Sequence, residues 1–142
     1  MKIYADTSAL VAWFHPADCF AAAVTQWCRE KSPEFFWNPF LRTELRHHLR
    51  RLSGSYAAIA WHGYRSSETS GRLRLNPHRI SEMLEWGDEI SVRFGANLPV
   101  GAWDCLHVSI AQQLRAEVFL TCDAAQAALA RLASLPKVHL VT

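Results

Sequence analysis

The 142-residue sequence contains no apolar run of the roughly 20 residues that a membrane-spanning helix needs. Its first residues also lack the basic segment and the apolar core of a signal peptide. The four cysteines form no Cys-x-x-Cys pair and no zinc-finger spacing, and their mostly apolar neighbours predict buried free thiols. We therefore expect a cytoplasmic protein with neither a membrane span nor a disulfide.

Two further absences narrow the class of protein. There is no glycine-rich phosphate loop, which argues against a nucleoside triphosphate as substrate. There is no internal repeat, low-complexity tract or linker, so we expect residues 1–142 to form one domain. Fifteen Lys and Arg against thirteen Asp and Glu give a net charge of +2. This small excess neither requires nor excludes a nucleic-acid partner, so the placement of the charges must decide.

Short strand-like runs alternate with helical patterns along the whole chain. Strands are predicted at residues 2–5, 34–37, 118–121 and 138–141, with a short edge strand at 73–75. Helices are predicted at residues 8–14, 18–31, 40–52, 56–64, 78–95, 102–115 and 123–133, with a polar loop at 66–71. The buried stripe of the helix at 78–95 is predicted to be Ile80, Met83, Leu84, Ile90 and Phe94. Alternating strands and helices predict an α/β fold: three layers, α/β/α, around a mostly parallel sheet of four to five strands.

The stretch KIYADTSAL places Asp6 directly after the first predicted strand. Asp6 or Thr7 could simply cap the helix that follows. Asp123, however, comes just after the predicted strand that ends at Thr121. Because parallel strands end at one edge of the sheet, where ligands bind in such folds, the two carboxylates are expected near each other.

Two more acids lie in otherwise apolar helical surroundings. Glu44 follows Leu41 and precedes Leu45, and Asp104 lies in the first turn of a strongly apolar helix. Taken alone, either could be structural, since a carboxylate at a helix start interacts favourably with the helix dipole. Four carboxylates at one edge would repel one another or take up protons unless a cation were bound. Oxygen ligands suit Mg²⁺ or Mn²⁺, which can activate water for attack on a phosphodiester.

Four motifs in order, DTSAL, RTEL, DCLHVSIAQQL and FLTCDAAQAALA, resemble those of PIN-domain ribonucleases, and among these the VapC-type toxins of toxin–antitoxin pairs. The resemblance covers essentially the whole chain. It implies a PIN-like fold and a Mg²⁺- or Mn²⁺-dependent endoribonuclease. It further implies an acidic quartet supported by two hydroxyl residues: Asp6, Glu44, Asp104 and Asp123 as metal-binding and catalytic residues, with Thr7 and Thr121 beside them.

The resemblance also implies partners. The substrate would be transfer or ribosomal RNA, cut to leave a 5′-phosphate and a 3′-hydroxyl. A cognate antitoxin protein would suppress the activity, and the chain would form a homodimer or a toxin–antitoxin hetero-oligomer. In one respect the sequence departs from the family: the segment NLPVGAWD has no Arg or Lys just before the third acid. The alternative is a nuclease of the same fold that acts on DNA, or in RNA processing outside a toxin pair.

Two other readings of the acids stay open at this point. Glu44 with His47, and Asp104 with His107, have the i, i+3 spacing of carboxylate–histidine pairs in dimetal four-helix bundles. The predicted strands disfavour that fold, and we expect His107 to hydrogen-bond a backbone group or a carboxylate instead. The acids could also belong to a module that only binds a partner protein through an aromatic groove.

Basic and aromatic residues allow contacts with RNA. Arg42, Arg46 and Arg50 fall at i, i+4 and i+8 beside Glu44, so they could hold phosphates or could form a solvated helix face. If Arg46 contacts a phosphate, Arg46→Ala should weaken RNA binding for all sequences and flatten its salt dependence. Five tryptophans could stack on bases or serve as core or interface anchors: Trp13, Trp37, Trp61, Trp86 and Trp103.

Overall fold

Five short parallel strands form the centre of the protein. A computed structural model describes residues 1–76 and 79–142. The strands are β1 (Ile3–Ala5), β2 (Phe35–Trp37), β3 (Leu73–Leu75), β4 (Val118–Thr121) and β5 (Val138–Leu140). They lie in the order β3-β2-β1-β4-β5, and every neighbouring pair is parallel. This confirms the predicted parallel sheet, including the edge strand at 73–75.

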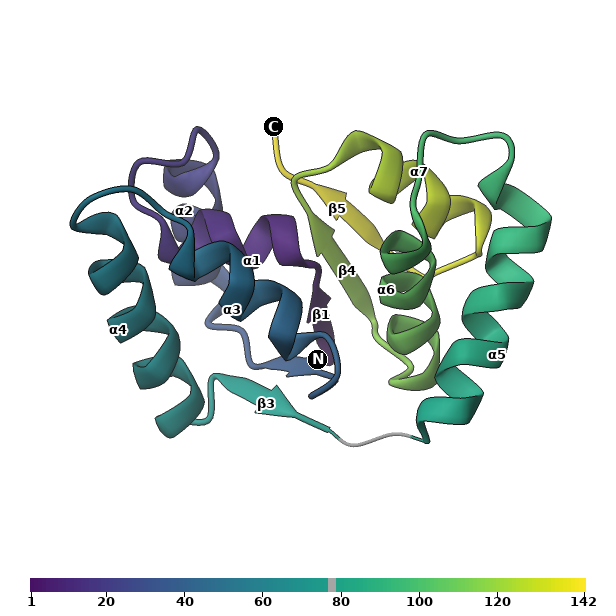
Figure 1. Ribbon diagram of the computed structural model, residues 1–142, viewed down its shortest axis with the longest axis horizontal. Coiled ribbons are helices and arrows are strands. Elements are labelled where there is room, and N and C mark those ends of the chain that lie inside the picture. Colours follow the sequence, from purple (N-terminus) through teal and green to yellow (C-terminus); the bar gives the residue numbers. More distant parts are fainter. Residues whose placement is uncertain (77–78) are drawn as a thin grey trace.

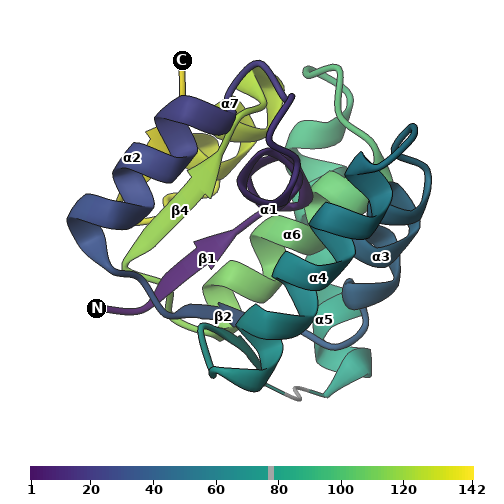
Figure 2. The same ribbon diagram turned by 90° about the vertical axis from the view of Figure 1, so that its left-hand side faces the viewer.

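Helices cover both faces of this sheet. On one side lie α1 (Thr7–Phe14), α2 (Ala21–Lys31), α3 (Arg42–Arg50) and α4 (Tyr56–Thr69). On the other lie α5 (Ile80–Ile90), its π-helical extension η1 (Ser91–Gly95), α6 (Ala102–Gln113) and α7 (Ala124–Leu132). Figure 1 shows the two helical layers with the strands between them, and Figure 2 shows α1 end-on, next to β1. The predicted three-layer α/β/α architecture is therefore confirmed.

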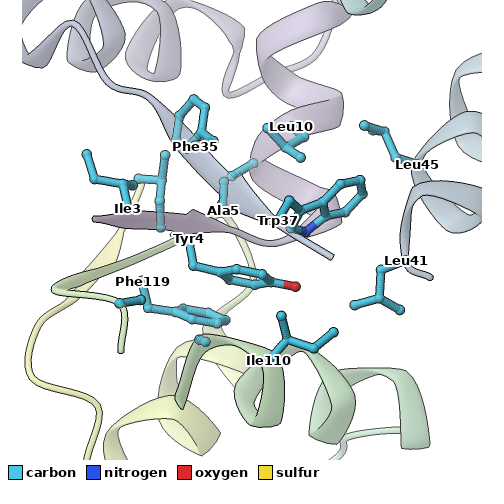
Figure 3. Packing of buried hydrophobic residues seen from close by; sticks show 14 of the residues in the cluster. Ile3, Tyr4, Ala5, Leu10, Phe35, Trp37, Leu41, Leu45, Ile110 and Phe119 are labelled. Atoms are coloured by element: carbon cyan, nitrogen blue, oxygen red, sulfur yellow. The ribbon is translucent and has the colours of Figure 1, made fainter. Parts of the chain in front are cut away.

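The core is built on β1, all of whose residues are buried. Tyr4 points to the side of α6, where its ring stacks on Phe119 with centroids 5.6 Å apart, as Figure 3 shows. Leu10 and Phe35 pack on the opposite side of the strand (Figure 3). A central parallel strand is covered on both faces, which explains why its sequence is apolar without alternation. The first polar side chain after this apolar run is Asp6.

One helix boundary was predicted wrongly. The sequence pattern ends a helix near Tyr64 and predicts a polar loop at 66–71, whereas α4 continues to Thr69. Polar side chains here bond within the helix: the Tyr64 hydroxyl donates to Glu68 and the Thr69 hydroxyl donates to the Arg65 carbonyl. Ser67 is buried. This polar run therefore continues the helix, because Glu68 and Thr69 each have a hydrogen-bond partner one turn earlier.

The predicted buried stripe of the helix at 78–95 is also wrong in part. Met83 and Ile90 are buried, but Ile80 is 51% exposed and Leu84 is 44% exposed. The predicted start of this helix at residue 78 lies outside the described residues, and α5 begins at Ile80. Gly87 faces α6 so closely that an added Cβ would lie 2.7 Å from Leu106, so the packed face of α5 centres on Gly87. Ile80 and Leu84 are therefore rotated away from the contact with α6.

The cysteines are free, as predicted, but one of them is not buried. Cys28 and Cys105 are buried and Cys122 is partly buried, whereas Cys19 is exposed in the turn before α2. Asp18 lies in the same turn and accepts from the Phe20 backbone N–H, so it stabilises the turn, and α2 begins only at Ala21. Within the described ranges, no helix has the length and apolar character to cross a membrane.

Candidate active site

The order of the strands reverses between β1 and β4. From β1 the sheet grows through β2 and β3 on one side, and through β4 and β5 on the other. In open parallel sheets, the crevice at the carboxyl ends of the two strands flanking such a reversal is where ligands bind. Asp6 directly follows β1, and its backbone N–H donates to the Leu120 carbonyl of β4 at 3.1 Å. Asp123 lies two residues after Thr121, the last residue of β4.

Asp6 is a buried carboxylate held by several donors. Its Oδ1 accepts from the Ser8 hydroxyl at 2.7 Å and from the Ala9 backbone N–H at 3.0 Å, so Asp6 caps α1 as the local pattern predicts. Its Oδ2 accepts from the Thr121 hydroxyl at 2.5 Å. Burial raises the pKa of Asp6 above its ordinary value, and nearby His107 and these hydrogen bonds limit the rise. The Thr121 hydroxyl therefore helps to orient the Asp6 carboxylate.

Glu44 belongs to a buried hydrogen-bond chain. Its Oε2 lies 2.5 Å from the donating Thr7 hydroxyl and 2.9 Å from His107 Nε2. On the other side of the ring, His107 Nδ1 lies 2.7 Å from the Tyr4 hydroxyl. Burial alone would raise the pKa of Glu44, but His107 and the hydrogen bond from Thr7 outweigh burial, so this pKa is lowered. The predicted bond from His107 to a carboxylate is confirmed, and the carboxylate is Glu44.

Asp104 and Asp123 both close the first turn of a helix. Asp104 Oδ2 accepts from the Gly101 N–H at 2.6 Å at the start of α6. Asp123 Oδ1 accepts from the backbone N–H groups of Ala125 and Gln126 at 2.7 and 3.0 Å, which caps α7. Each side chain thus has one carboxylate oxygen fixed by the backbone. Among the described residues, the other oxygen of each accepts no hydrogen bond, so it is available to a ligand.

All four acids line one pocket of about 590 Å³. They come from four places in the sequence: the ends of β1 and β4, and the starts of α3 and α6. Thr7 and His107 line the same pocket. The pocket therefore contains four carboxylates, and the pKa of one of them, Glu44, lies below its ordinary value. A bound cation would reduce the repulsion among them.

The donor set fits a hydrated hard cation. Over residues 1–76 and 79–142, no three of the Asp, Glu, His and Cys side chains converge closely enough to enclose a metal. Mg²⁺ does not need such an enclosure, because it usually keeps several waters and binds one or two carboxylates together with substrate phosphates. The unbonded oxygens of Glu44, Asp104 and Asp123 supply ligands of this kind. Oδ2 of Asp6 accepts one hydrogen bond, from Thr121, and keeps a second lone pair for an ion. The pocket is also large enough for waters between the ion and the more distant acids.

Besides His107, three polar residues of the pocket were not among the predicted site residues. Ser8 joins the two strand ends, since its hydroxyl donates to Asp6 and accepts from the Cys122 backbone N–H at 3.0 Å. Asp18 and His48 also line the pocket. The sequence signal for His48 is its position four residues after Glu44, one helical turn along the same face. Asp18 gives no such signal, because an aspartate that only stabilises a turn would have the same sequence surroundings.

The arginines beside Glu44 face α4 and do not line the acidic pocket. Arg42 forms an ion pair with Glu68 at 3.3 Å. The guanidinium groups of Arg46 and Arg50 lie over the ring of Trp61, 5.0 and 5.2 Å from its centroid. The contact of these three arginines with RNA phosphates stays a prediction. The structure gives Arg46 and Arg50 a packing contact that the helical spacing alone does not reveal.

Arg46→Ala is expected to lower the free energy of unfolding by about 0.5–2 kcal/mol, because it removes the cation–π contact and the packing on Trp61. Denaturation of this variant beside Arg51→Ala, which removes the same charge from an exposed position, measures the effect. RNA binding at several salt concentrations then tests the phosphate contact: a salt slope reduced by about one for Arg46→Ala alone would support it. Equal salt slopes of RNA binding for both variants would mean that Arg46 contributes packing and no phosphate contact.

The sequence matches the model of the PIN domain family over residues 3–132. The chain belongs to the PIN domain family. PIN domains are nucleases, and they generally use divalent metals. Because a PIN domain has a parallel sheet, the alternative of a dimetal four-helix bundle is wrong, and Glu44 pairs with His107 of α6 instead of the neighbouring His47.

Among solved structures, this PIN domain is similar to the crystal structure of FitAcB from Neisseria gonorrhoeae. The TM-score is 0.67 and the sequence identity 15%, and the match covers 98% of this chain and 97% of that chain. At this identity the likeness concerns the fold. A comparison with curated protein sequences found no match.

Proposed function

We propose that this PIN domain is a Mg²⁺- or Mn²⁺-dependent endoribonuclease that acts as the toxin of a VapC-type toxin–antitoxin pair. The observation that carries the proposal is the pocket at the β1–β4 reversal, where four carboxylates from separate segments lie together. Asp6, Asp104 and Asp123 each accept a backbone hydrogen bond at a helix start, but Glu44 caps no helix and still lies in the same pocket. The ordered motifs of the sequence support the same assignment.

The acids of the pocket divide into two roles. Asp6, Glu44 and Asp104 would hold the ion, and Asp123 would complete the site through water or a second ion. When bound, Mg²⁺ or Mn²⁺ activates water and neutralises phosphate charge. Thr7 and Thr121 donate to Glu44 and Asp6, which fixes the orientation of these carboxylates. Such second-layer hydrogen bonds determine where ligand oxygens point. His107 and Tyr4 extend this support into the core.

The substrate and partner follow from the proposed class. The substrate would be a transfer or ribosomal RNA, and the cognate antitoxin would block the pocket in the cytoplasm, where both occur. A protein that only binds a partner could share the fold. Such a protein would not need a metal site made of carboxylates. Measurements of metal binding and of RNA cleavage therefore distinguish a partner-binding protein from a nuclease. A nuclease acting on DNA remains the second candidate, since a phosphodiester of either nucleic acid fits the same chemistry.

Total RNA incubated with the purified protein tests this function. With Mg²⁺ or Mn²⁺ we expect one dominant cut, with a 5′-phosphate on the downstream fragment and a 3′-hydroxyl upstream. EDTA should stop the reaction, and mapping of the new 5′ ends names the RNA. Cleavage of single-stranded or duplex DNA under conditions in which RNA stays intact would favour the second candidate. Intact RNA and DNA would contradict the nuclease assignment.

We also propose that the chain is a homodimer through the exposed side of α5. Ile80 and Leu84 continue an apolar pattern that predicts burial, yet both are about half exposed in one chain. A second copy covering them would satisfy the pattern. Leu84→Glu should therefore shift the protein from dimer to monomer, because it places a charge in the apolar contact. Sedimentation at micromolar concentration measures the shift, and a wild type that sediments as a monomer would refute the dimer.

A further inference from the structure

Two exposed aromatic rings lie close along the chain to acids of the pocket, and the mechanism above does not use them. Phe40 precedes α3, and Trp103 lies in the first turn of α6. The centroids of their rings are 5.7 Å apart and the ring planes differ by 24°, so the two rings are stacked. Phe40 is 40% exposed and Trp103 is 44% exposed. The pair therefore presents aromatic surface to solvent. Its two residues are 63 positions apart in the sequence.

The position of the pair links it to two of the proposed metal ligands. Trp103 directly precedes Asp104, and consecutive Cα atoms lie about 3.8 Å apart. Phe40 lies four residues before Glu44, in the turn that leads into α3 at Arg42. Neither ring lines the pocket itself, but Glu44 and Asp104 do, so the stacked rings join the two chain segments that bring these acids to the pocket.

Hydrogen bonds fix the backbone that carries each ring. The Phe40 N–H donates to Oδ1 of the buried Asn38 at 2.8 Å. The bond from the Gly101 N–H to Asp104 closes the turn that contains Trp103. The same contact thus orients a carboxylate and the ring beside it. A ligand that stacks on rings held in this way loses little affinity to the ordering of the protein.

The surroundings favour a flat aromatic ligand over a phosphate. Residues 96–104, ANLPVGAWD, contain no Lys or Arg, so this segment offers no cation to a phosphate beside Asp104. What it offers instead is an exposed indole ring. Nucleobases stack on such rings with little preference for sequence, but only when the base is unpaired and can leave its own stack.

We propose that Phe40 and Trp103 form a stacking platform for an unpaired base next to the scissile phosphodiester, so that the substrate is single-stranded at the cut. The inference rests on the proposed nuclease function and specifies its substrate. It also explains how the chain can orient a nucleotide beside Asp104 without a basic residue there. The contact is independent of base identity, so the platform selects strand state and leaves sequence selection to other residues.

Binding of uncleaved strands tests the platform. Affinity is measured in EDTA for a short single-stranded RNA of mixed sequence, for its duplex, and for a strand of equal length made of abasic sugars. Wild type should prefer the single strand to both of the others. Trp103→Ala should bind the single strand roughly 5- to 150-fold more weakly than wild type does, whereas its affinity for the abasic strand should change little. Trp103→Phe should retain most of the affinity, and the salt slope should not change, because no phosphate contact is lost.

Trp86→Ala is the matched control, since Trp86 is an exposed tryptophan on α5, 42% accessible. Thermal unfolding and Mn²⁺ titration of Trp103→Ala show whether the fold and the acids are undisturbed. Equal affinity of wild type and Trp103→Ala for the single strand would overturn the platform, and so would a wild type that does not prefer the single strand. Weaker binding of a partner protein by Trp103→Ala, with unchanged RNA affinity, would also overturn it. If the protein cleaves RNA but its RNA affinity does not depend on Trp103, only the platform is refuted. If RNA binding depends on Trp103 but no cleavage occurs, only the nuclease function is refuted.

Discussion

Asp104→Asn is expected to lower RNA cleavage by orders of magnitude while the protein stays folded. Loss of a carboxylate ligand weakens metal binding and misplaces the attacking water, and each 1.36 kcal/mol added to the barrier costs about a factor of ten in rate. The fold should survive because the asparagine side-chain oxygen can still accept from the Gly101 N–H. In metal-free buffer the variant should melt at the same temperature as wild type or higher, because one of four mutually repelling charges is gone.

Glu30→Gln is the control for this experiment, since it removes one negative charge from an exposed position of α2. It should cleave RNA at the wild-type rate. If Asp104 served only the helix dipole, Asp104→Asn would instead cost about 0.3–1 kcal/mol of stability and leave cleavage nearly normal. Thermal melts in EDTA and in Mn²⁺, measured beside the cleavage rate, distinguish the two outcomes. Wild-type cleavage by the Asp104→Asn variant would refute the acidic-quartet assignment.

His107→Leu is expected to reduce both stability and cleavage. His107 is 3% exposed and bonds to Tyr4 on one side and Glu44 on the other. Its loss leaves the buried Tyr4 hydroxyl without a partner, which should cost about 1–3 kcal/mol of unfolding free energy. Glu44 loses the bond that orients it, and removal of such a supporting contact typically lowers metal affinity or activity about 10- to 100-fold.

A second substitution separates the two effects of His107. In Tyr4→Phe/His107→Leu both polar partners are absent from the core, so most of the lost stability should return. Cleavage should stay low, because Glu44 still lacks its support. Urea denaturation and cleavage rates of the two single variants and the double variant complete the cycle. Recovery of cleavage together with stability would mean that His107 acts only through the fold.

The fold and the acidic cluster were largely predictable because they depend on local patterns. An apolar strand that ends in a carboxylate is visible in the sequence at Asp6 and, after Thr121, at Asp123. Once the strands are known to be parallel, geometry requires that their carboxyl ends meet at one edge. This geometry joins Asp6 and Asp123 only. Glu44 and Asp104 were assigned to the same site through the resemblance of their motifs to PIN-domain ribonucleases, and the pocket contains all four acids.

The contacts that were missed all depend on partners distant in the sequence. The bond between Tyr4 and His107 joins residues 103 positions apart, and the stack of Phe40 on Trp103 joins two helix starts. The arginine stripe of α3 has helical spacing that fits either solvent or phosphate, and only the packing of α4 shows Trp61 beside it. Hydrophobic pattern likewise could not reveal that Gly87 centres the contact of α5 with α6.

Calorimetric titration with Mn²⁺ tests the central claim most directly, because the account requires the four carboxylates to form a cation site. Wild type should bind Mn²⁺, and its melting temperature should rise with the ion, since binding to the folded state alone stabilises it. Asp104→Asn should bind clearly more weakly, and Glu30→Gln should match wild type. Mn²⁺ binding that is absent in wild type, or equally strong in Asp104→Asn, would contradict the assignment of this pocket as a metal site.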